Sequence, residues 1–305
     1  MLRDWGRVGM SALLLVFSAV YLSALQFDET FFPNLEETRE EDVYLRGIAQ
    51  LYPGRVLFEA PALIARSERT EAAKIENLPR DVKYVRIYRL EEAIPVIREV
   101  IAHPALVLDF RYLKSPSSGS ALHALMSRRT AETTLTLIGD APDHIREELA
   151  QAERGTVNRA HPAIILSNRE TAGPFEAVLA GLQTEGSIIA VGENTAGRTG
   201  FYDHIRPQTW VLCGELRPAP QISLIPGGFA PRIHVKLSPE TDYRSYHLYE
   251  AGTQLEQLIR QETRTLPVSK DNGESSAVSV QTDQVLQRGI EIVAALQVLQ
   301  ELPDS

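Results

Sequence analysis

The chain has 305 residues, of which 44% are apolar and 23% charged, as in an ordinary globular protein of one domain with appendages or two small domains. Its net charge of −9 excludes the basic surface expected of a nucleic-acid-binding protein, so no nucleic-acid partner is predicted. The single cysteine, Cys213, excludes an intramolecular disulfide and a cysteine metal cage, and the seven histidines lack metal-ligand spacing, so neither a metal nor a cofactor is predicted.

The first 27 residues have the pattern of a membrane signal anchor. Arg3 and Arg7 precede residues 8–25, which carry no charge. As a helix this segment would be about 27 Å long at ~1.5 Å per residue, close to the ~30 Å hydrocarbon core of a bilayer. Acidic residues follow at once, so the positive-inside rule predicts a cytoplasmic N-terminus and a periplasmic or extracellular remainder. A cleaved signal peptide is the alternative, although the small-residue pattern before a cut is poor.

The rest of the chain divides into residues 28–80, an acidic stalk or N-terminal subdomain, and residues 81–305, the folded core. In the stalk, the patterns predict a helix over 40–51, a strand over 56–65 and a short helix over 68–75. In the first part of the core, strands are predicted over 83–88, 105–110 and 134–138, and helices over 90–101, 121–128 and 142–154. This alternation indicates an α/β fold.

The central part of the core, residues 161–202, has the order strand, turn, helix, strand, glycine loop. Apolar runs at 163–166 and 187–191 predict buried strands, and a helix begins near Pro174 and ends at Gly186. The strand-to-helix turn and the glycine loop, residues 192–200, should therefore lie near one another, in a common position for an active site. The glycine loop lacks the residue order of a phosphate-binding loop.

The last third of the chain is predicted to hold two more strands and two helices. The strands are expected over 209–213 and 232–237, and the first helix over 247–263. A Ser-, Gly- and Asp-rich segment over 266–282 follows. Asp283 is then predicted to N-cap an amphipathic helix that ends at Leu302.

Two motifs in the central part resemble those of the tail-specific (C-terminal-processing) serine peptidases. Thr171-Ala-Gly-Pro-Phe-Glu176 is similar to the family's Ser-Ala-Ser-Ala-x-Glu turn, and Gly192-Glu-Asn-Thr-Ala-Gly-Arg-Thr-Gly200 to its Gly-Glu-x-Thr-x-Gly-Lys-Gly loop. The resemblance implies a ClpP/crotonase-like core of ββα units. It places the family's nucleophilic serine on Gly173 and its general-base lysine on Arg198, whereas Glu176, Glu193, Thr195 and Gly197 match.

A third motif departs from the family pattern in the same way. Asp109-Phe-Arg111 resembles the family's Asp-Leu-Arg, which leads into a Gly-Gly turn that supplies an oxyanion-hole N–H. This chain has Pro116 in that loop, and proline has no N–H to donate, so Gly119 is the remaining candidate.

These replacements remove both groups of a serine–lysine dyad. Gly173 has no side chain, and the guanidinium of Arg198 stays protonated and cannot act as a base. A rebuilt site could use Ser167 or Thr171 as the nucleophile. The serines of the other loop, at 115, 117 and 118, are further candidates, and the base would be His161, His204 or Glu176.

Arg198 then has two possible roles. It could bind a ligand carboxylate, with Glu176, Thr195 and Gly119 as neighbours in a binding site, or form a salt bridge to Glu170, Glu176 or Glu193.

The sequence thus predicts a membrane-anchored, tail-specific-peptidase-like protein. A non-catalytic pseudo-peptidase that binds polypeptide or an envelope partner is favoured. An active serine peptidase with a displaced nucleophile and a structural subunit of an envelope complex are the alternatives.

Overall fold

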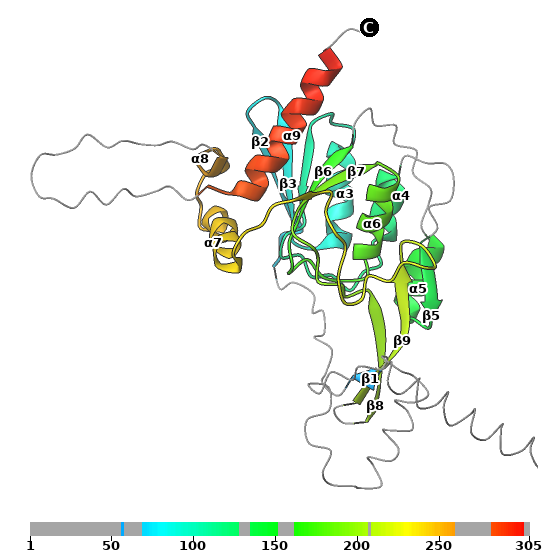
Figure 1. Ribbon diagram of the computed structural model, residues 1–305. Helices are drawn as coiled ribbons and strands as arrows, with labels where there is room; N and C mark the ends of the chain where they lie inside the picture. The colour runs from blue at the N-terminus through cyan, green and yellow to red at the C-terminus, as the bar shows by residue number, and fades with distance from the viewer. Residues whose placement is uncertain are drawn as a thin grey trace, which may run out of the picture. The chain divides into compact units, whose positions relative to one another are not determined.

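The computed structural model describes residues 56–57, 69–127, 135–151, 162–206, 209–259 and 282–301, drawn as coloured ribbon in Figure 1. The chain divides into two compact units: Met1–Pro61 with Asp203–Val211, and Ala62–Tyr202 with Leu212–Ser305. In the first unit, β1 (Val56–Leu57) pairs antiparallel with residues 210–211 of β9. The helix predicted over 40–51 lies outside the described residues. The second unit contains the large sheet and the candidate site.

A six-stranded sheet forms the centre of the second unit, with its strands in the order β10, β7, β6, β4, β3, β2. All neighbouring strands run parallel except β2 and β3, which form an antiparallel hairpin. The central strands are short apolar runs because both of their faces are covered. The strands are β2 (Ala73–Leu78), β3 (Val82–Ile87), β4 (Leu106–Asp109), β6 (Ala163–Ser167), β7 (Ile188–Gly192) and β10 (Ile233–His234).

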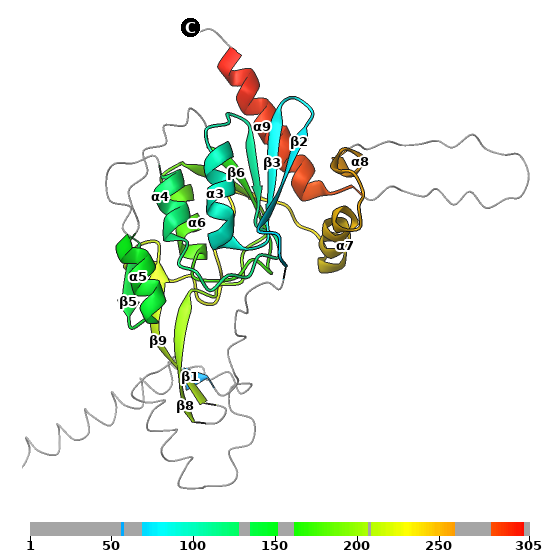
Figure 2. The same cartoon turned by 180° about the vertical axis from the view of Figure 1, so that it is seen from behind.

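Helices cover both faces of this sheet (Figures 1 and 2). One face packs against α3 (Leu90–Val100), α4 (Ser120–Met126) and α6 (Glu176–Thr184). The other packs against α7 (Pro239–Glu250), α8 (Leu255–Ile259) and α9 (Gln284–Glu301). Successive strand residues alternate between the two cores, so Leu108 lies in the first and Val107 in the second. The arrangement is a mixed α/β fold, as predicted.

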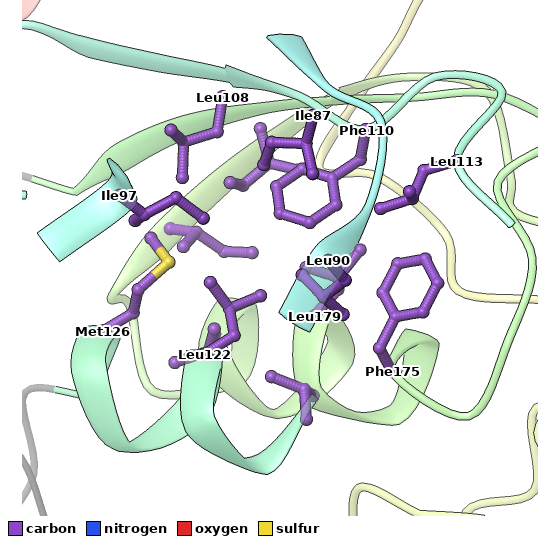
Figure 3. Packing of buried hydrophobic residues seen from close by; sticks show 14 of the residues in the cluster. Ile87, Leu90, Ile97, Leu108, Phe110, Leu113, Leu122, Met126, Phe175 and Leu179 are labelled. Atoms are coloured by element: carbon purple, nitrogen blue, oxygen red, sulfur yellow. The ribbon is translucent and has the colours of Figure 1, made fainter. Parts of the chain in front are cut away.

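The first core is shown in Figure 3, where side chains from α3, α4 and α6 meet those of the sheet. Ile97 of α3 lies towards Leu108, and Phe175 and Leu179 approach from α6 and the turn before it. The rings of Phe110 and Phe175 are stacked with centroids 6.1 Å apart. The turn that carries the candidate site is therefore fixed by core packing on its inner side.

A smaller antiparallel sheet contains β5 (Thr136–Gly139), β8 (Gly200–Arg206) and β9 (Thr209–Arg217). Within the second unit, β5 pairs with residues 214–217 of β9. The helix α5 (Asp143–Gln151) adds Ile145, which is fully buried, to the first core.

The short helix predicted over 68–75 is wrong, because residues 73–78 form the strand β2. Pairing with β3 overrides the helix-forming composition of this segment. The hairpin turns through Pro79, Arg80 and Asp81, the last two with left-handed φ angles of 63° and 56°. Residues 73–78, which the sequence analysis assigned to the stalk, thus belong to the core sheet.

The helix predicted over 247–263 is also wrong in its bounds, because two helices replace it. The first begins at Pro239, and its N-cap Ser238 accepts a hydrogen bond from the Thr241 N–H (3.1 Å). The chain leaves it at Gly252, which has a φ of +95°. The strand predicted over 232–237 is confirmed only at residues 233–234.

The other core predictions are confirmed with small shifts at the element ends. They comprise the strands β3 to β7, the start of β9, and the helices α3 to α6 and α9. Asp283 N-caps α9 as expected, since its carboxylate accepts the Leu286 N–H (3.0 Å). Among the described residues, no helix is long and apolar enough to span a bilayer. The predicted membrane segment, residues 8–25, lies outside them.

Candidate active-site region

The turn after β6 is anchored to the end of the neighbouring strand β4. The hydroxyl of Thr171 donates to the carbonyl of Phe110 (2.9 Å), and the Tyr112 N–H donates to the side-chain oxygen of Asn168 (3.1 Å). Within the turn, the Thr171 N–H donates to the Asn168 carbonyl (3.0 Å). Because these two parallel strands end side by side, the turn lies at the carboxyl edge of the sheet, where α/β proteins commonly bind ligands.

The loop after β4 lies directly against this turn. The Ala172 N–H donates to the carbonyl of Leu113 (2.9 Å), and the Ser115 N–H donates to the carbonyl of Ala172 (3.1 Å). Lys114 and Ala172 thereby form a parallel β-bridge. The loop and the turn are thus hydrogen-bonded to each other.

Gly173, which the resemblance predicts to be the nucleophile position, has no room for a side chain. Its φ is +145°, a conformation that residues with a Cβ rarely adopt. A Cβ built there would lie 2.0 Å from the carbonyl oxygen of Ser115 and 3.0 Å from the ring of Phe175. The backbone of the facing loop therefore occupies the space that a nucleophile would need.

Glu176 is fully buried and connects the turn to the glycine loop. Four donors converge on its carboxylate: the backbone N–H groups of Gly173 (3.0 Å), Gly197 (2.7 Å) and Arg198 (2.8 Å), and the Thr195 hydroxyl. Burial raises the pKa of Glu176, although the four hydrogen bonds oppose this shift. The matching acidic residue of the two motifs thus has a structural role, holding both segments in one arrangement.

The glycine loop is also packed tightly against the chain before β10. The Thr195 hydroxyl accepts the Phe229 N–H (2.8 Å). Gly197 has a left-handed φ of +70°, and a Cβ there would lie 2.6 Å from the carbonyl oxygens of Leu224 and Pro226. Neither Thr195 nor Glu176, both predicted as binding residues, lies at the surface.

Arg198, which the resemblance predicts to be the position of the base, has an exposed side chain. The three acidic residues considered as its partners have other contacts. Glu193 pairs with Arg169 (2.8 Å) and Glu170 with Lys114 (2.8 Å). Glu176 accepts the backbone N–H of Arg198 (2.8 Å). The backbone N–H of Arg198 therefore holds this residue beside the turn, and its side chain is exposed.

Truncating Arg198 should have little effect on stability. Because its side chain is exposed, Arg198→Ala should change the free energy of unfolding by less than about 1 kcal/mol. Arg86→Met, which removes a fully buried guanidinium, is the matched contrast and should cost about 3 kcal/mol or more. Urea denaturation followed by circular dichroism measures both. A loss at Arg198→Ala as large as that at Arg86→Met would show a buried ion pair instead.

The backup nucleophiles are buried and already hydrogen-bonded. Ser167 is fully buried and donates to the carbonyl of Glu193 (3.0 Å), and Thr171, equally buried, donates to Phe110. Gly119, the remaining oxyanion-hole candidate, directs its N–H to the Ser117 hydroxyl (3.2 Å). Of the proposed bases, Glu176 binds backbone donors, and the side chains of the histidines at 161 and 204 lie outside the described residues.

The serines of the facing loop converge on one carboxylate. Oε2 of Glu148, in α5, accepts from the hydroxyls of Ser117 (3.0 Å) and Ser118 (2.6 Å) and from the Ser118 N–H (2.7 Å). Ser118 is fully buried. This contact fixes the loop on its outer side, while the Ala172 bridge fixes it on the inner side.

A buried charge cluster, which the sequence analysis did not identify, lies behind the turn. Arg111 is fully buried and forms two-point hydrogen bonds with Asp109 (3.0 and 2.7 Å) and with Asp283 (2.9 and 2.8 Å). Arg86, also fully buried, lies 3.4 Å from Asp109 and 2.9 Å from Glu250. The Asp-Phe-Arg motif and the acidic cap of the last helix were each visible in the sequence, but their pairing was not.

Several solved structures are similar in fold to this chain. No protein-family model and no curated protein matches the chain. Proteases are among these similar structures. They include a candidate S41 protease from Bacteroides fragilis, with 16% identity, a TM-score of 0.44 and coverage of 78% of this chain and 60% of that one. The photosystem II D1 C-terminal processing protease has 20% identity and a TM-score of 0.39, and the match covers 58% of this chain and 46% of that one. Mature CPAF has 12% identity and a TM-score of 0.44, and the match covers 63% of this chain and 55% of that one. The chain thus spans less than two thirds of each of these neighbours.

Proposed function

We propose that this chain is a tail-specific-peptidase-like protein without hydrolytic activity, which binds polypeptide or an envelope partner. The observation that carries the proposal is the filled nucleophile position: a side chain at residue 173 would lie 2.0 Å from the carbonyl oxygen of Ser115. The exposed Arg198 supports it further, because a guanidinium does not accept a proton at neutral pH. Position 173 therefore offers no nucleophile and no space for one, and position 198 offers no base.

We also propose that residues 8–25 anchor the chain in a membrane. The anchor would hold the core at the periplasmic or extracellular surface, where a partner could be an unstructured polypeptide or a component of an envelope complex. Co-purification of the full chain separates these two cases, since a complex subunit retains one partner in fixed stoichiometry. A polypeptide-binding protein instead exchanges its peptides.

One contact favours a second candidate, a serine hydrolase that uses Ser118. Its hydroxyl donates to Glu148 at 2.6 Å, so a carboxylate lies in the position of a general base. Ser118 is fully buried, however, and Glu148 also accepts two further hydrogen bonds from the loop, which together favour a structural role.

The test is activity of the purified full chain. We expect no cleavage of an unstructured polypeptide such as casein above a buffer control, and no labelling by a serine-reactive fluorophosphonate. The Ser118→Ala, Ser167→Ala and Thr171→Ala variants serve as matched controls. Labelling or hydrolysis by the unmodified chain that one of these variants abolishes would identify a displaced nucleophile and contradict the proposal.

A further inference from the structure

The outermost strand of the large sheet has one edge with no partner strand among the described residues. β2 is the last strand in the sheet order, and among the described residues it pairs only with β3 (Figures 1 and 2). Its six residues contain no proline, and their register against β3 runs without a bulge from Ala73 to Leu78. Such an edge presents backbone donors and acceptors to another strand unless side chains prevent pairing.

The backbone pattern identifies the residues that would form the new hydrogen bonds. The carbonyl of Ala72 accepts the Tyr88 N–H (2.9 Å), so residue 72 directs its polar groups towards β3. Because these directions alternate along a strand, the even-numbered residues of β2 face β3. The odd-numbered residues 73, 75 and 77 therefore direct their N–H and C=O groups outward.

The side chains at the centre of this edge combine one apolar residue with two opposite charges. Ile75 is 41% exposed and is one of only five large exposed hydrophobic residues in the part of the chain that the structure describes. Lys74 and Glu76 flank it on the opposite face of the sheet, with their charged groups 3.3 Å apart and their side chains 40% and 34% exposed. This sequence is self-complementary when it meets a copy of itself in the antiparallel direction.

Electrostatics favour one of the three registers that centre the pair on residues 74, 75 or 76. With the two-fold axis at Ile75, Lys74 lies opposite Glu76 of the second copy at both symmetric positions. With the axis at residue 74, two lysines would be opposite each other, and with the axis at residue 76, two glutamates. Directly opposed like charges destabilise strand pairs, whereas opposite charges stabilise them. The Lys–Glu positions are also the closely spaced, non-hydrogen-bonded pairs.

We propose that β2 is a self-association surface, through which two copies of this chain pair antiparallel about Ile75 and join their six-stranded sheets. The contact is isologous, as in most two-fold dimers. A single strand pair is smaller than the ~1,200 Å² lower limit of stable interfaces, so the dimer should dissociate in the micromolar range. This inference is independent of the proposed function, because no residue of the turn or the glycine loop takes part.

Charge reversal and charge exchange test the register. Sedimentation velocity of the detergent-solubilised full chain should show a concentration-dependent dimer. Lys74→Glu or Glu76→Lys alone should weaken it about tenfold or more, because each places two pairs of like charges opposite each other. The exchange variant, Lys74→Glu with Glu76→Lys, should restore it. Arg288→Glu, an exposed charge reversal on α9, is the control and should leave dimerisation unchanged.

Thermal melts of every variant verify folding, since Glu76 also accepts a hydrogen bond from Tyr249 (2.8 Å) that both Glu76 variants lose. A chain that remains monomeric at high micromolar concentration would overturn the proposal. So would a dimer that the single reversals do not weaken, or one that the exchange variant fails to restore.

Discussion

Gly173→Ser is expected to destabilise the protein severely and not to create an enzyme. The new Cβ would lie 2.0 Å from the Ser115 carbonyl oxygen, a distance that real Cβ atoms essentially never show, and the φ of +145° is strained for any L-residue with a side chain. Relief of this overlap requires movement of the loop that is hydrogen-bonded to Ala172. Loss of both hydrogen bonds, together with the strain, should cost about 3–5 kcal/mol, as measured by urea denaturation.

Two other glycines separate the contributions of overlap and dihedral strain. Gly227 has no neighbour within 4 Å of a built Cβ, and its φ is not left-handed, so Gly227→Ala should change stability by less than about 0.5 kcal/mol. Gly186 has equally open space but a φ of +78°, and Gly186→Ala should cost about 1 kcal/mol. If Gly173→Ser lowers the free energy of unfolding by no more than Gly186→Ala does, the loop that contains Ser115 can move away from residue 173. The space at residue 173 would then be open to a side chain.

The same geometry explains why restoring both dyad groups should not restore activity. In Gly173→Ser with Arg198→Lys, the serine would still precede Pro174, which has no N–H to contribute to an oxyanion hole. A missing oxyanion donor alone lowers the rate by roughly 10²–10³. The double variant should therefore hydrolyse polypeptide no faster than background. Turnover would first be expected after Pro174→Ala and glycines at 115–116 are added.

Much of the core fold could be predicted from the sequence because its signals are local. The short apolar runs at 105–110, 163–166 and 187–191 predict buried strands, and the structure has strands there. β2 could not be predicted, because its charged residues favour no strand until β3 pairs with them. The start of α7 is marked locally by Ser238 and Pro239, but the apolar pattern further along the chain predicted a later start.

That the two motifs lie together could be predicted from the order strand, turn, helix, strand, and the hydrogen bonds of Glu176 to Gly173 and Arg198 confirm it. The assignment of the dyad positions to Gly173 and Arg198 rests on the resemblance and stays a prediction. That the loop at Leu113 and Ser115 fills the space could not be predicted, because it depends on bonds between segments about sixty residues apart. The chain thus closes the site by backbone contacts, which leave no residue signature.

The buried charge cluster could not be predicted from the sequence either, because Arg111 and Asp283 are 172 positions apart in the chain. Burial alone would raise the pKa of Asp109, but the charges of Arg111 and Arg86 outweigh this effect and lower its pKa to about 2. A pKa depressed from 3.8 means that Asp109 stabilises the folded state above pH ~4, and that this stability is lost as the pH falls towards 2. The cluster is therefore an ionised network at neutral pH.

Arg111→Met should accordingly have one of the largest effects of any single substitution in this chain. Methionine fills much of the same volume but leaves Asp109 and Asp283, both fully buried, without their main counter-charge. Removal of one partner from a buried ionic network costs about 3–5 kcal/mol, because the remaining charges stay desolvated. Arg288→Met, on the exposed side of α9, is the control and should cost less than about 0.5 kcal/mol.

A second substitution distinguishes lost charge from lost packing. Asp283→Asn keeps the N-cap of α9, since asparagine caps helices as well as aspartate does, but removes one buried negative charge. If unpaired charge causes the damage, Arg111→Met with Asp283→Asn should be more stable than the sum of the two single effects, by about 1–3 kcal/mol. The cost of Arg111→Met should also shrink below pH 4, where the unpaired Asp109 can take up a proton. Strictly additive costs that do not change between pH 7 and pH 3 would show that Arg111 contributes only its packing volume.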